Sequence, residues 1–119
     1  VYKRQVYMLH YEIQGDSLII YIKDELDHHA VTYLRETSDR LIEAGNVKNI
    51  VFDFKDVSFM DSSGIGLIMG RYKKVMFIGG KAAVTNVGNA VDRIFKISGL
   101  YKIIEKYDTI QEALYENRI

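Results

Sequence analysis

The segments NIVFDF, Asn49–Phe54, and MDSSGIGLIMGRYKKVMF, Met60–Phe77, decide the fold class of this chain. The first alternates in the period of a β-strand, with Ile50, Phe52 and Phe54 pointing one way and Val51 and Asp53 the other. The second predicts a helix from about Ser63 to Phe77, because its apolar residues recur at helical spacing: Ile65, Ile68, Met69, Tyr72 and Val75. Gly79-Gly80 should end this helix. Together the segments predict a strand, a loop and a helix.

The chain before this unit predicts a hairpin and a first helix. Tyr7–Gln14 and Ser17–Asp24 flank the turn signal Gly15-Asp16, and one face of the second strand should be core, with Leu18, Ile20 and Ile22. Asp27 is positioned to cap the first helix, which should end at Gly45. The apolar positions of that helix are Ala30, Leu34, Leu41 and Ile42.

The chain after the unit repeats the alternation of strand and helix. We expect a strand at Lys81–Thr85, a helix at about Asn89–Ile97 with Gly99 behind it, and a brief strand at Lys102–Glu105. Thr109–Glu112 has the form of a capping box that opens the last helix. The predicted order is ββαβαβαβα.

Strands that alternate with helices indicate parallel neighbours joined by right-handed crossovers. If successive strands are also neighbours in space, every helix lies on the same face of the sheet. The alternating polar positions favour that arrangement, since a sheet covered on both faces should read as near-continuous apolar runs. A doubly wound sheet is the alternative. The fold class is therefore α/β, one domain over residues 1–119 with a mixed, mostly parallel sheet.

Composition excludes several classes of function. The 119 residues are 48% hydrophobic and 27% charged, and no apolar run approaches the roughly 20 residues that span a bilayer, so we expect a soluble protein without a membrane partner. Sixteen basic and sixteen acidic residues cancel, which argues against direct nucleic-acid binding. The chain has no cysteine, hence neither disulfides nor a thiolate metal site. VYKRQVYML lacks a signal-segment pattern, so a cytoplasmic location is expected.

The loop between the central strand and helix lies where open α/β sheets place their ligands, yet it fails the common catalytic and phosphate-binding patterns. A dinucleotide fingerprint would need glycine at Met69, and no glycine-lysine-serine or glycine-lysine-threonine sequence is present. A hydrolase elbow needs glycine on both sides of Ser62, but Met60 occupies one of those positions. We therefore expect no enzyme and no cofactor.

Two other groups of residues are better explained by structure than by chemistry. His28 and His29 are adjacent and cannot both face one metal ion from the start of a helix, and with His10 they do not form an evident ligand set. No metal site is expected. The Tyr72-Lys73-Lys74 cluster is more typical of an exposed helix face than of a nucleic-acid patch.

As a helix N-terminus, Asp61-Ser62-Ser63-Gly64 is well suited, because Asp and Ser oxygens accept the unpaired N–H groups of a first turn. Three features exceed that need: redundant cap residues, Gly64 and Gly66 in the first two turns, and Met60 beside the cap. Each glycine in a helix interior costs about 0.5–1 kcal/mol relative to alanine, from which a fold gains nothing. Close approach of another protein's backbone, or of an active site that reaches Ser62, would explain them.

Three segments together resemble the STAS-domain anti-sigma factor antagonists of the sporulation type. They are FMDSSGIGLIMGRYKKV at Phe59–Val75, ELDHHAV at Glu25–Val31 and ISGLYKII at Ile97–Ile104. The resemblance implies phosphorylation at Ser62, and an acidic docking segment that carries over to Glu25 and Asp27. Asp24 stands where the family usually has glycine, which changes the turn and charge there. The expected partner-binding residues are Glu25, Asp27, Met60, Asp61, Ser62, Ser63, Gly64 and Gly66.

The resemblance also implies how such a protein works. The unphosphorylated form binds an anti-sigma factor that is also a serine kinase and so releases the sigma factor; phosphorylation ends the complex, and a PP2C-type phosphatase resets it. Two alternatives stay open: a nucleotide- or small-ligand-binding domain that uses the Asp61–Gly66 loop, and an antagonist that serves a stress-response rather than a sporulation sigma factor.

Overall fold

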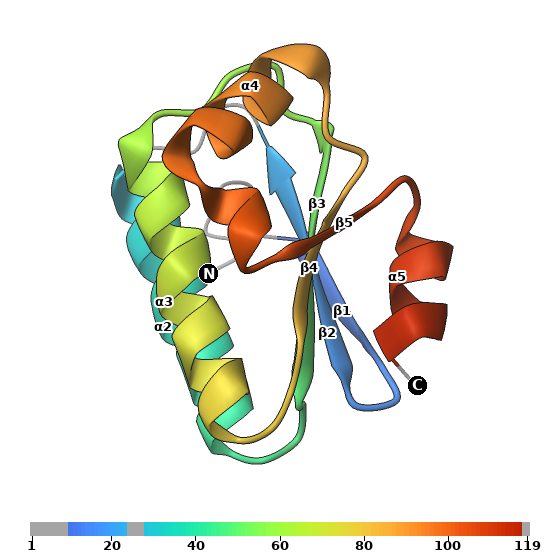
Figure 1. Cartoon of the computed structure of the whole chain (residues 1–119). Helices are drawn as coiled ribbons and strands as arrows, with labels where there is room; N and C mark the ends of the chain where they lie inside the picture. The colour runs from blue at the N-terminus through green and yellow to red at the C-terminus, as the bar shows by residue number, and fades with distance from the viewer. Residues whose placement is uncertain (1–9, 24–27, 118–119) are drawn as a thin grey trace.

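The computed structural model of the protein describes residues 10–23 and 28–117. Strands and helices alternate after an initial hairpin, and a short 3₁₀ turn precedes the last strand (Figure 1). The elements are β1 (His10–Gln14), β2 (Ser17–Lys23), α2 (His28–Glu43), β3 (Asn49–Asp56), α3 (Ser62–Phe77), β4 (Ala82–Thr85), α4 (Asn89–Ser98), η1 (Leu100–Lys102), β5 (Glu105–Tyr107) and α5 (Ile110–Asn117). No helix among the described residues is long and apolar enough to cross a membrane.

The five strands form one sheet in sequence order, β1-β2-β3-β4-β5. β1 and β2 are antiparallel across the turn at Gly15, whose φ of 62° is left-handed, and the other pairs are parallel. In the parallel register Ile50 lies between Leu18 and Ala82. The predicted hairpin, the mixed and mostly parallel sheet and the α/β class are confirmed. The predicted strand residues Tyr7–Leu9 and Asp24, and the Asp27 cap, lie outside the described residues.

The helices do not all lie on one face, so that prediction was wrong. α2, α3 and α4 cover one face, whereas α5 lies on the other (Figure 1). The handedness rule constrains only helices that connect two parallel strands, and no strand among the described residues follows α5. The buried methyl group of Ala113 instead packs with Ile19, Val51 and Ala83 on the second face.

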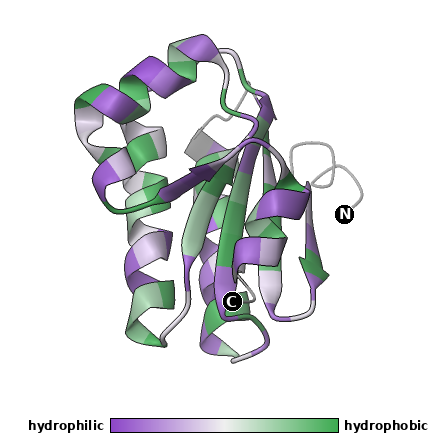
Figure 2. Ribbon diagram, turned by 45° about the vertical axis from the view of Figure 1, so that its right-hand side comes forward, coloured by the Kyte–Doolittle hydropathy of each residue, from purple (hydrophilic) through white to green (hydrophobic). Residues whose placement is uncertain are grey.

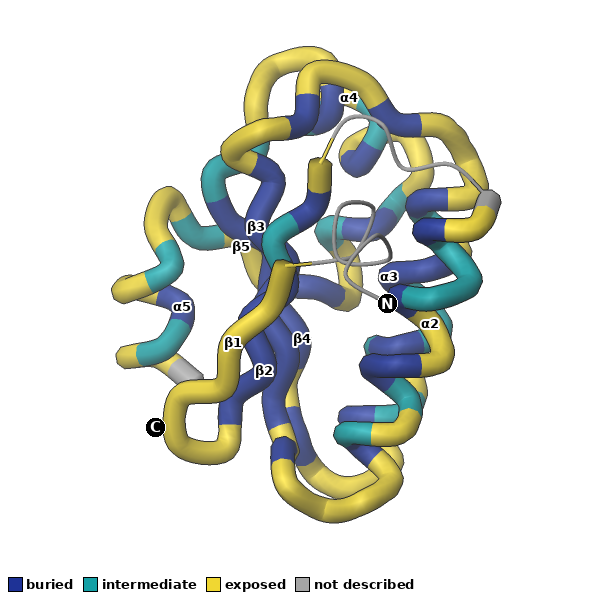
Figure 3. Tube along the Cα trace, turned by 180° about the vertical axis from the view of Figure 1, so that it is seen from behind, coloured by how far each residue is buried: buried dark blue, intermediate teal, exposed yellow. Residues whose placement is uncertain are grey.

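The inner strands are consequently buried on both sides. β2, β3 and β4 are dark in Figure 3, while all of β1 is exposed. Hydrophobic residues follow the central strands (Figure 2). As predicted, Leu18, Ile20 and Ile22 share the main core with Ile50, Phe52 and Phe54. The alternating polar residues of the strands were expected to mark a face open to solvent, and they do not. Asp53, for example, is buried, and its carboxylate accepts hydrogen bonds from the Thr85 hydroxyl and the Asn86 side-chain amide.

Two local predictions also needed correction. The last strand begins at Glu105 rather than Lys102, because Gly99 in the left-handed region (φ 81°) ends α4 and a 3₁₀ turn follows it. In α3, Ile65, Met69 and Tyr72 are only partly buried, whereas Leu67 and Arg71 are buried. α3 packs against α2 as well as the sheet, so its buried stripe is wider than a single-faced helix predicts.

Candidate functional site

Residues 57–61, which we call the Ser62 loop, connect the end of β3 to Ser62 at the start of α3. The loop lies at the carboxyl end of the parallel strands (Figure 1). Val57 and Met60 anchor it, since both side chains are buried in the main core. The Val57 N–H donates to the Phe54 carbonyl at 3.1 Å. The loop is therefore held at both ends by the core.

Asp61 caps α3, as predicted. Its backbone is extended, and its Oδ1 accepts hydrogen bonds from the Ser63 N–H at 3.0 Å and from the Ser63 hydroxyl at 2.6 Å. The Ser63 hydroxyl and then its N–H lower the pKa of the Asp61 carboxyl, so the cap is ionised at neutral pH. A negative charge at a helix N-terminus is also favoured by the helix dipole.

The two adjacent serines differ in what their hydroxyl groups do. Ser62 is the first residue of α3 and is exposed, and no hydrogen bond joins its hydroxyl to another described residue. Ser63 is exposed too, but its hydroxyl is engaged by the Asp61 carboxylate. Of the two, Ser62 presents the more available oxygen.

Gly64 corrects the inference that the fold gains nothing from the glycines of α3. An added Cβ at Gly64 would lie 2.6 Å from the Cγ and Sδ atoms of Met60 and 2.8 Å from its Cε. Gly64 is itself buried, and Met60 is only 7% exposed. Gly64 therefore serves packing within this chain: it makes room for the side chain that anchors the loop.

Gly66 is different. It is exposed, and an added Cβ would have no atom within 4 Å. Nothing in the described part of the fold requires glycine at this position. Of the two glycines, only Gly66 keeps the predicted explanation that another molecule approaches the helix closely.

The sequence interpretation missed Phe59, whose side chain is 67% exposed one residue before the buried Met60. A phenylalanine beside an apolar helix is usually a core residue, so its residue type did not mark Phe59 as part of a binding surface. The available signal was its position: Phe59 falls in neither the strand alternation nor the helical spacing. With Asp61, Ser62, Ser63 and Gly66 it forms what we call the Ser62 surface.

The remaining predicted positions contribute less. Glu25 and Asp27 lie outside the described residues. Among the described residues, no cluster of three or more His, Asp or Glu side chains could hold a metal ion. His10 is exposed and packs against the Tyr21 ring at a centroid distance of 5.0 Å.

The cavity beside the loop bears on the ligand-binding alternative. Described residues that include Phe59, Asp61 and Ser63 enclose about 90 Å³. Pockets for small molecules and cofactors usually measure roughly 300–1,000 Å³. The cavity that the described residues line is thus smaller than the usual size of such pockets, which does not favour the nucleotide-binding alternative.

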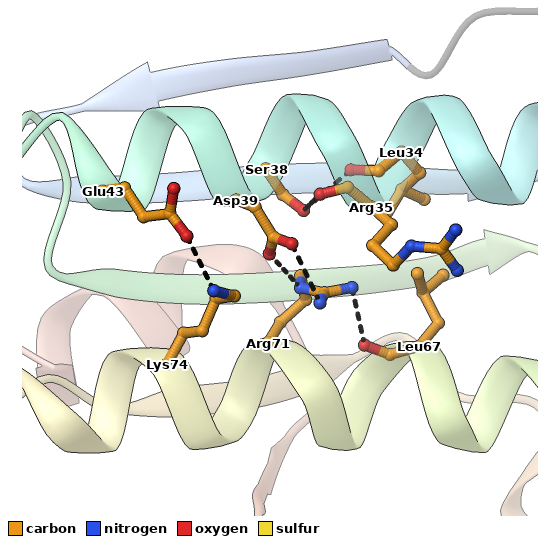
Figure 4. Close-up of polar contacts among 8 residues, drawn as sticks. All are labelled: Leu34, Arg35, Ser38, Asp39, Glu43, Leu67, Arg71 and Lys74. Atoms are coloured by element: carbon orange, nitrogen blue, oxygen red, sulfur yellow. Dashed lines mark hydrogen bonds and ion pairs between the residues drawn. The ribbon is translucent and has the colours of Figure 1, made fainter.

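An ion pair between α2 and α3 fixes the helix that carries the Ser62 surface. Arg71 is 5% exposed, and its Nε lies 2.7 Å from Asp39 Oδ1 (Figure 4). Nη2 of the same guanidinium donates to Asp39 Oδ2 at 3.3 Å. Burial lowers the pKa of Arg71, and the Asp39 carboxylate opposes that effect. Two contacts to one carboxylate hold the helices in register.

Comparison with known proteins agrees with this architecture. The STAS domain family matches residues 8–113. An anti-sigma F factor antagonist of Paenibacillus polymyxa is 42% identical over 83% of this chain and 85% of the relative, and an anti-sigma-B factor antagonist of Bacillus subtilis is 37% identical over 76% and 81%.

Among solved structures, the anti-sigma factor antagonist SpoIIAA in its unphosphorylated form matches with a TM-score of 0.83 at 33% identity, over 92% of this chain and 96% of that one. The phosphorylated form of SpoIIAA from Bacillus matches with a TM-score of 0.76 at 32% identity, over 91% and 97%. The relatives named above are anti-sigma factor antagonists, and the chain belongs to the STAS domain family.

Proposed function

We propose that this protein is an anti-sigma factor antagonist whose binding is switched off by phosphorylation of Ser62. The unphosphorylated Ser62 surface binds an anti-sigma factor that is also a serine kinase, and so frees the sigma factor. The kinase transfers the γ-phosphoryl group of ATP to the Ser62 hydroxyl, and a PP2C-type phosphatase removes it. The similar protein SpoIIAA, known in unphosphorylated and phosphorylated forms, supports this proposal. The exchange takes place in the cytoplasm.

The single observation that carries the proposal is the exposed Ser62 hydroxyl at the N-terminus of a firmly packed helix. A kinase can reach this oxygen without unfolding the loop. Ser63 is the poorer acceptor, because its hydroxyl already donates to Asp61 at 2.6 Å and would have to leave the cap.

The same position explains why a phosphate would change binding but not the fold. At a helix N-terminus an anion is favoured by roughly 0.3–1 kcal/mol. In a partner interface, however, the phosphate must lose its hydration beside the ionised Asp61 carboxylate, at a cost of several kcal/mol. Because about 1.4 kcal/mol is tenfold in affinity, a loss of a hundredfold or more is expected. The two forms should have nearly superimposable backbones.

The test uses three variants and purified kinase–sigma complexes. Asp61 rather than Ser62 provides the cap, so Ser62→Ala should keep its fold, bind the kinase persistently and release sigma with ATP present. Ser62→Asp should bind at least a hundredfold more weakly in calorimetry. Ser63→Ala is the matched control and should still be phosphorylated, as read by mass spectrometry. Equal affinity of Ser62→Ala and Ser62→Asp would contradict the charge mechanism, and phosphate on Ser63 would contradict the site.

The relatives include antagonists of both anti-sigma F and anti-sigma-B factors. The same experiment is therefore run against a sporulation complex and a stress-response complex. Preferential sigma release from one of them assigns the pathway.

A further inference from the structure

The end of α3 opposite Ser62 carries an exposed apolar run that the proposed function does not use. Met76, Phe77 and Ile78 are 50%, 92% and 42% exposed. Single exposed apolar residues are ordinary, but consecutive ones mark binding surfaces or aggregation sites. A phenylalanine that is almost fully in water is the least expected of the three.

This run borders a groove where α2 and α3 both end and β3 begins. Its volume is about 740 Å³. The buried side chains of Ile42 and Val47 lie beneath it, and Phe77 and Ile78 form one wall. We call it the C-terminal groove. The cavity beside the Ser62 loop, at about 90 Å³, is much smaller.

The charges around the groove are mainly positive. Lys48, Lys73 and Lys74 line it, and Glu43 is its one lining carboxylate among the described residues. Lys74 Nζ lies 2.7 Å from Glu43 Oε2, so that pair is neutral overall (Figure 4). Lys48 and Lys73 form no ion pair with any residue in the described part of the chain.

Helix C-termini carry partial negative charge, and the C-termini of α2 and α3 meet at this groove. Their free carbonyl groups would offset part of the positive charge of the lysines. Several of these carbonyls are already satisfied. The N–H of Gly45 donates to the Ile42 carbonyl at 3.0 Å, and the N–H of Gly79 donates to the Met76 carbonyl at 3.0 Å. Positive charge from Lys48 and Lys73 therefore remains at the rim.

The groove is far from the Ser62 surface. The two sites are at opposite ends of α3, whose 16 residues span about 24 Å at 1.5 Å per residue. A molecule in the groove would not touch a partner at Ser62, nor would a phosphate on Ser62 repel it strongly across that distance in salt.

We propose that the C-terminal groove binds an acidic amphipathic segment of another protein. An apolar side chain of that segment packs against Phe77 over the floor of the groove, and neighbouring Asp or Glu side chains lie near Lys48 and Lys73. Charge complementarity favours this occupant. A flat anionic membrane would leave the concave floor unfilled, and a second copy would bring the same lysines face to face.

The test titrates isotope-labelled protein with three pools of short degenerate peptides and follows backbone amides by NMR. The first pool mixes Asp and Glu with Leu, Ile and Phe; the second replaces the acids with Lys and Arg; the third keeps the acids but replaces the apolar residues with Ser. Shifts at Val47, Lys48, Phe77 and Ile78 are expected from the first pool alone. Amides at Ser62 should not move, and a Ser62→Asp protein should give the same result.

Variants make the outcome specific. Phe77→Ser, and separately Lys48→Glu with Lys73→Glu, should each weaken binding of the first pool by about tenfold or more. Tyr115→Ser and Lys102→Glu change exposed residues elsewhere and are the matched controls. Urea unfolding verifies that every variant folds.

Three results would overturn the proposal. One is the absence of shifts with the first pool, or equal shifts with the second. A second such result is a concentration-dependent dimer in sedimentation experiments that the Phe77→Ser variant no longer forms. That result would make a second copy of the chain the occupant of the groove. The third is binding to anionic phosphatidylserine vesicles through the same residues without any binding of peptide.

Discussion

Replacing Gly64 and Gly66 separately by alanine applies the same chemical change to neighbouring positions of α3, with opposite expected effects on stability. At Gly66 the new methyl group meets no atom within 4 Å. Alanine there gains helix propensity, about 0.5–1 kcal/mol. Gly66→Ala should therefore raise the free energy of unfolding by that amount.

At Gly64 the same methyl group would lie 2.6 Å from Met60 Cγ and Sδ, which is far inside van der Waals contact. The Met60 side chain is flexible and can move, but to do so it must leave a site where it is 7% exposed. Full burial of a methionine contributes about 1.5–3 kcal/mol. After the propensity gain is subtracted, Gly64→Ala should lower the free energy of unfolding by about 1–2 kcal/mol.

Urea unfolding measures both changes, and a double-mutant cycle tests the cause. In a Met60→Ala background the clash is gone, so Gly64→Ala should become neutral or mildly stabilising. A coupling energy near zero, or a Gly64→Ala protein as stable as Gly66→Ala, would refute the packing explanation of Gly64.

The Gly64→Ala and Gly66→Ala variants also distinguish an effect on folding stability from an effect on partner binding. If Gly66 is retained for close approach of a partner, Gly66→Ala should stabilise the protein and yet weaken kinase binding. Unchanged affinity by calorimetry would remove Gly66 from the Ser62 surface.

Two further perturbations test the polar contacts that hold the helices. Asp39→Ala leaves the buried Arg71 guanidinium without its carboxylate and should lower the free energy of unfolding in urea by about 3 kcal/mol. The double variant Asp39→Leu with Arg71→Met removes both charges and should stay within about 1 kcal/mol of the parent. Equal losses in the two proteins would contradict this expectation. The Asp92 carboxylate accepts hydrogen bonds from the Tyr101 hydroxyl and from Lys106 Nζ, and these contacts hold the pKa of Asp92 well below its usual value. Its contribution to the free energy of unfolding is therefore full above pH about 4 and is lost as the pH falls below that value. Asp92→Asn should therefore be less stable than the parent at pH 7, and the difference should shrink as thermal unfolding is repeated toward pH 2; a constant difference would argue against the charged form.

Local signals in the sequence determined the elements of this protein. Alternation along Asn49–Phe54, the helical spacing of Ala30, Leu34 and Ile42, and the Asp61 cap each depend on a few neighbouring residues, so they survive in the folded chain. At the predicted Thr109–Glu112 capping box, Thr109 caps α5 through its side chain, since the Glu112 N–H donates to Thr109 Oγ1 at 3.1 Å. The Glu112 carboxylate accepts from the Thr109 hydroxyl at 3.3 Å rather than from its backbone N–H, so only this half of the reciprocal box is formed. The parallel order of the strands followed from general rules of connection.

Long-range packing decided the rest. The face that α5 covers depends on whether Ala113 meets an apolar patch built from three separate strands, which no local pattern encodes. The reason for Gly64 became visible only once Met60 folded back beneath α3. Arg71 reads as a surface residue until α2 supplies Asp39 across the helix pair. The sequence by itself therefore determined most of the strands and helices, the bounds of the last strand excepted, and where Ser62 lies in them. The tertiary structure decided which side chains are buried, because burial depends on contacts between residues far apart in the chain.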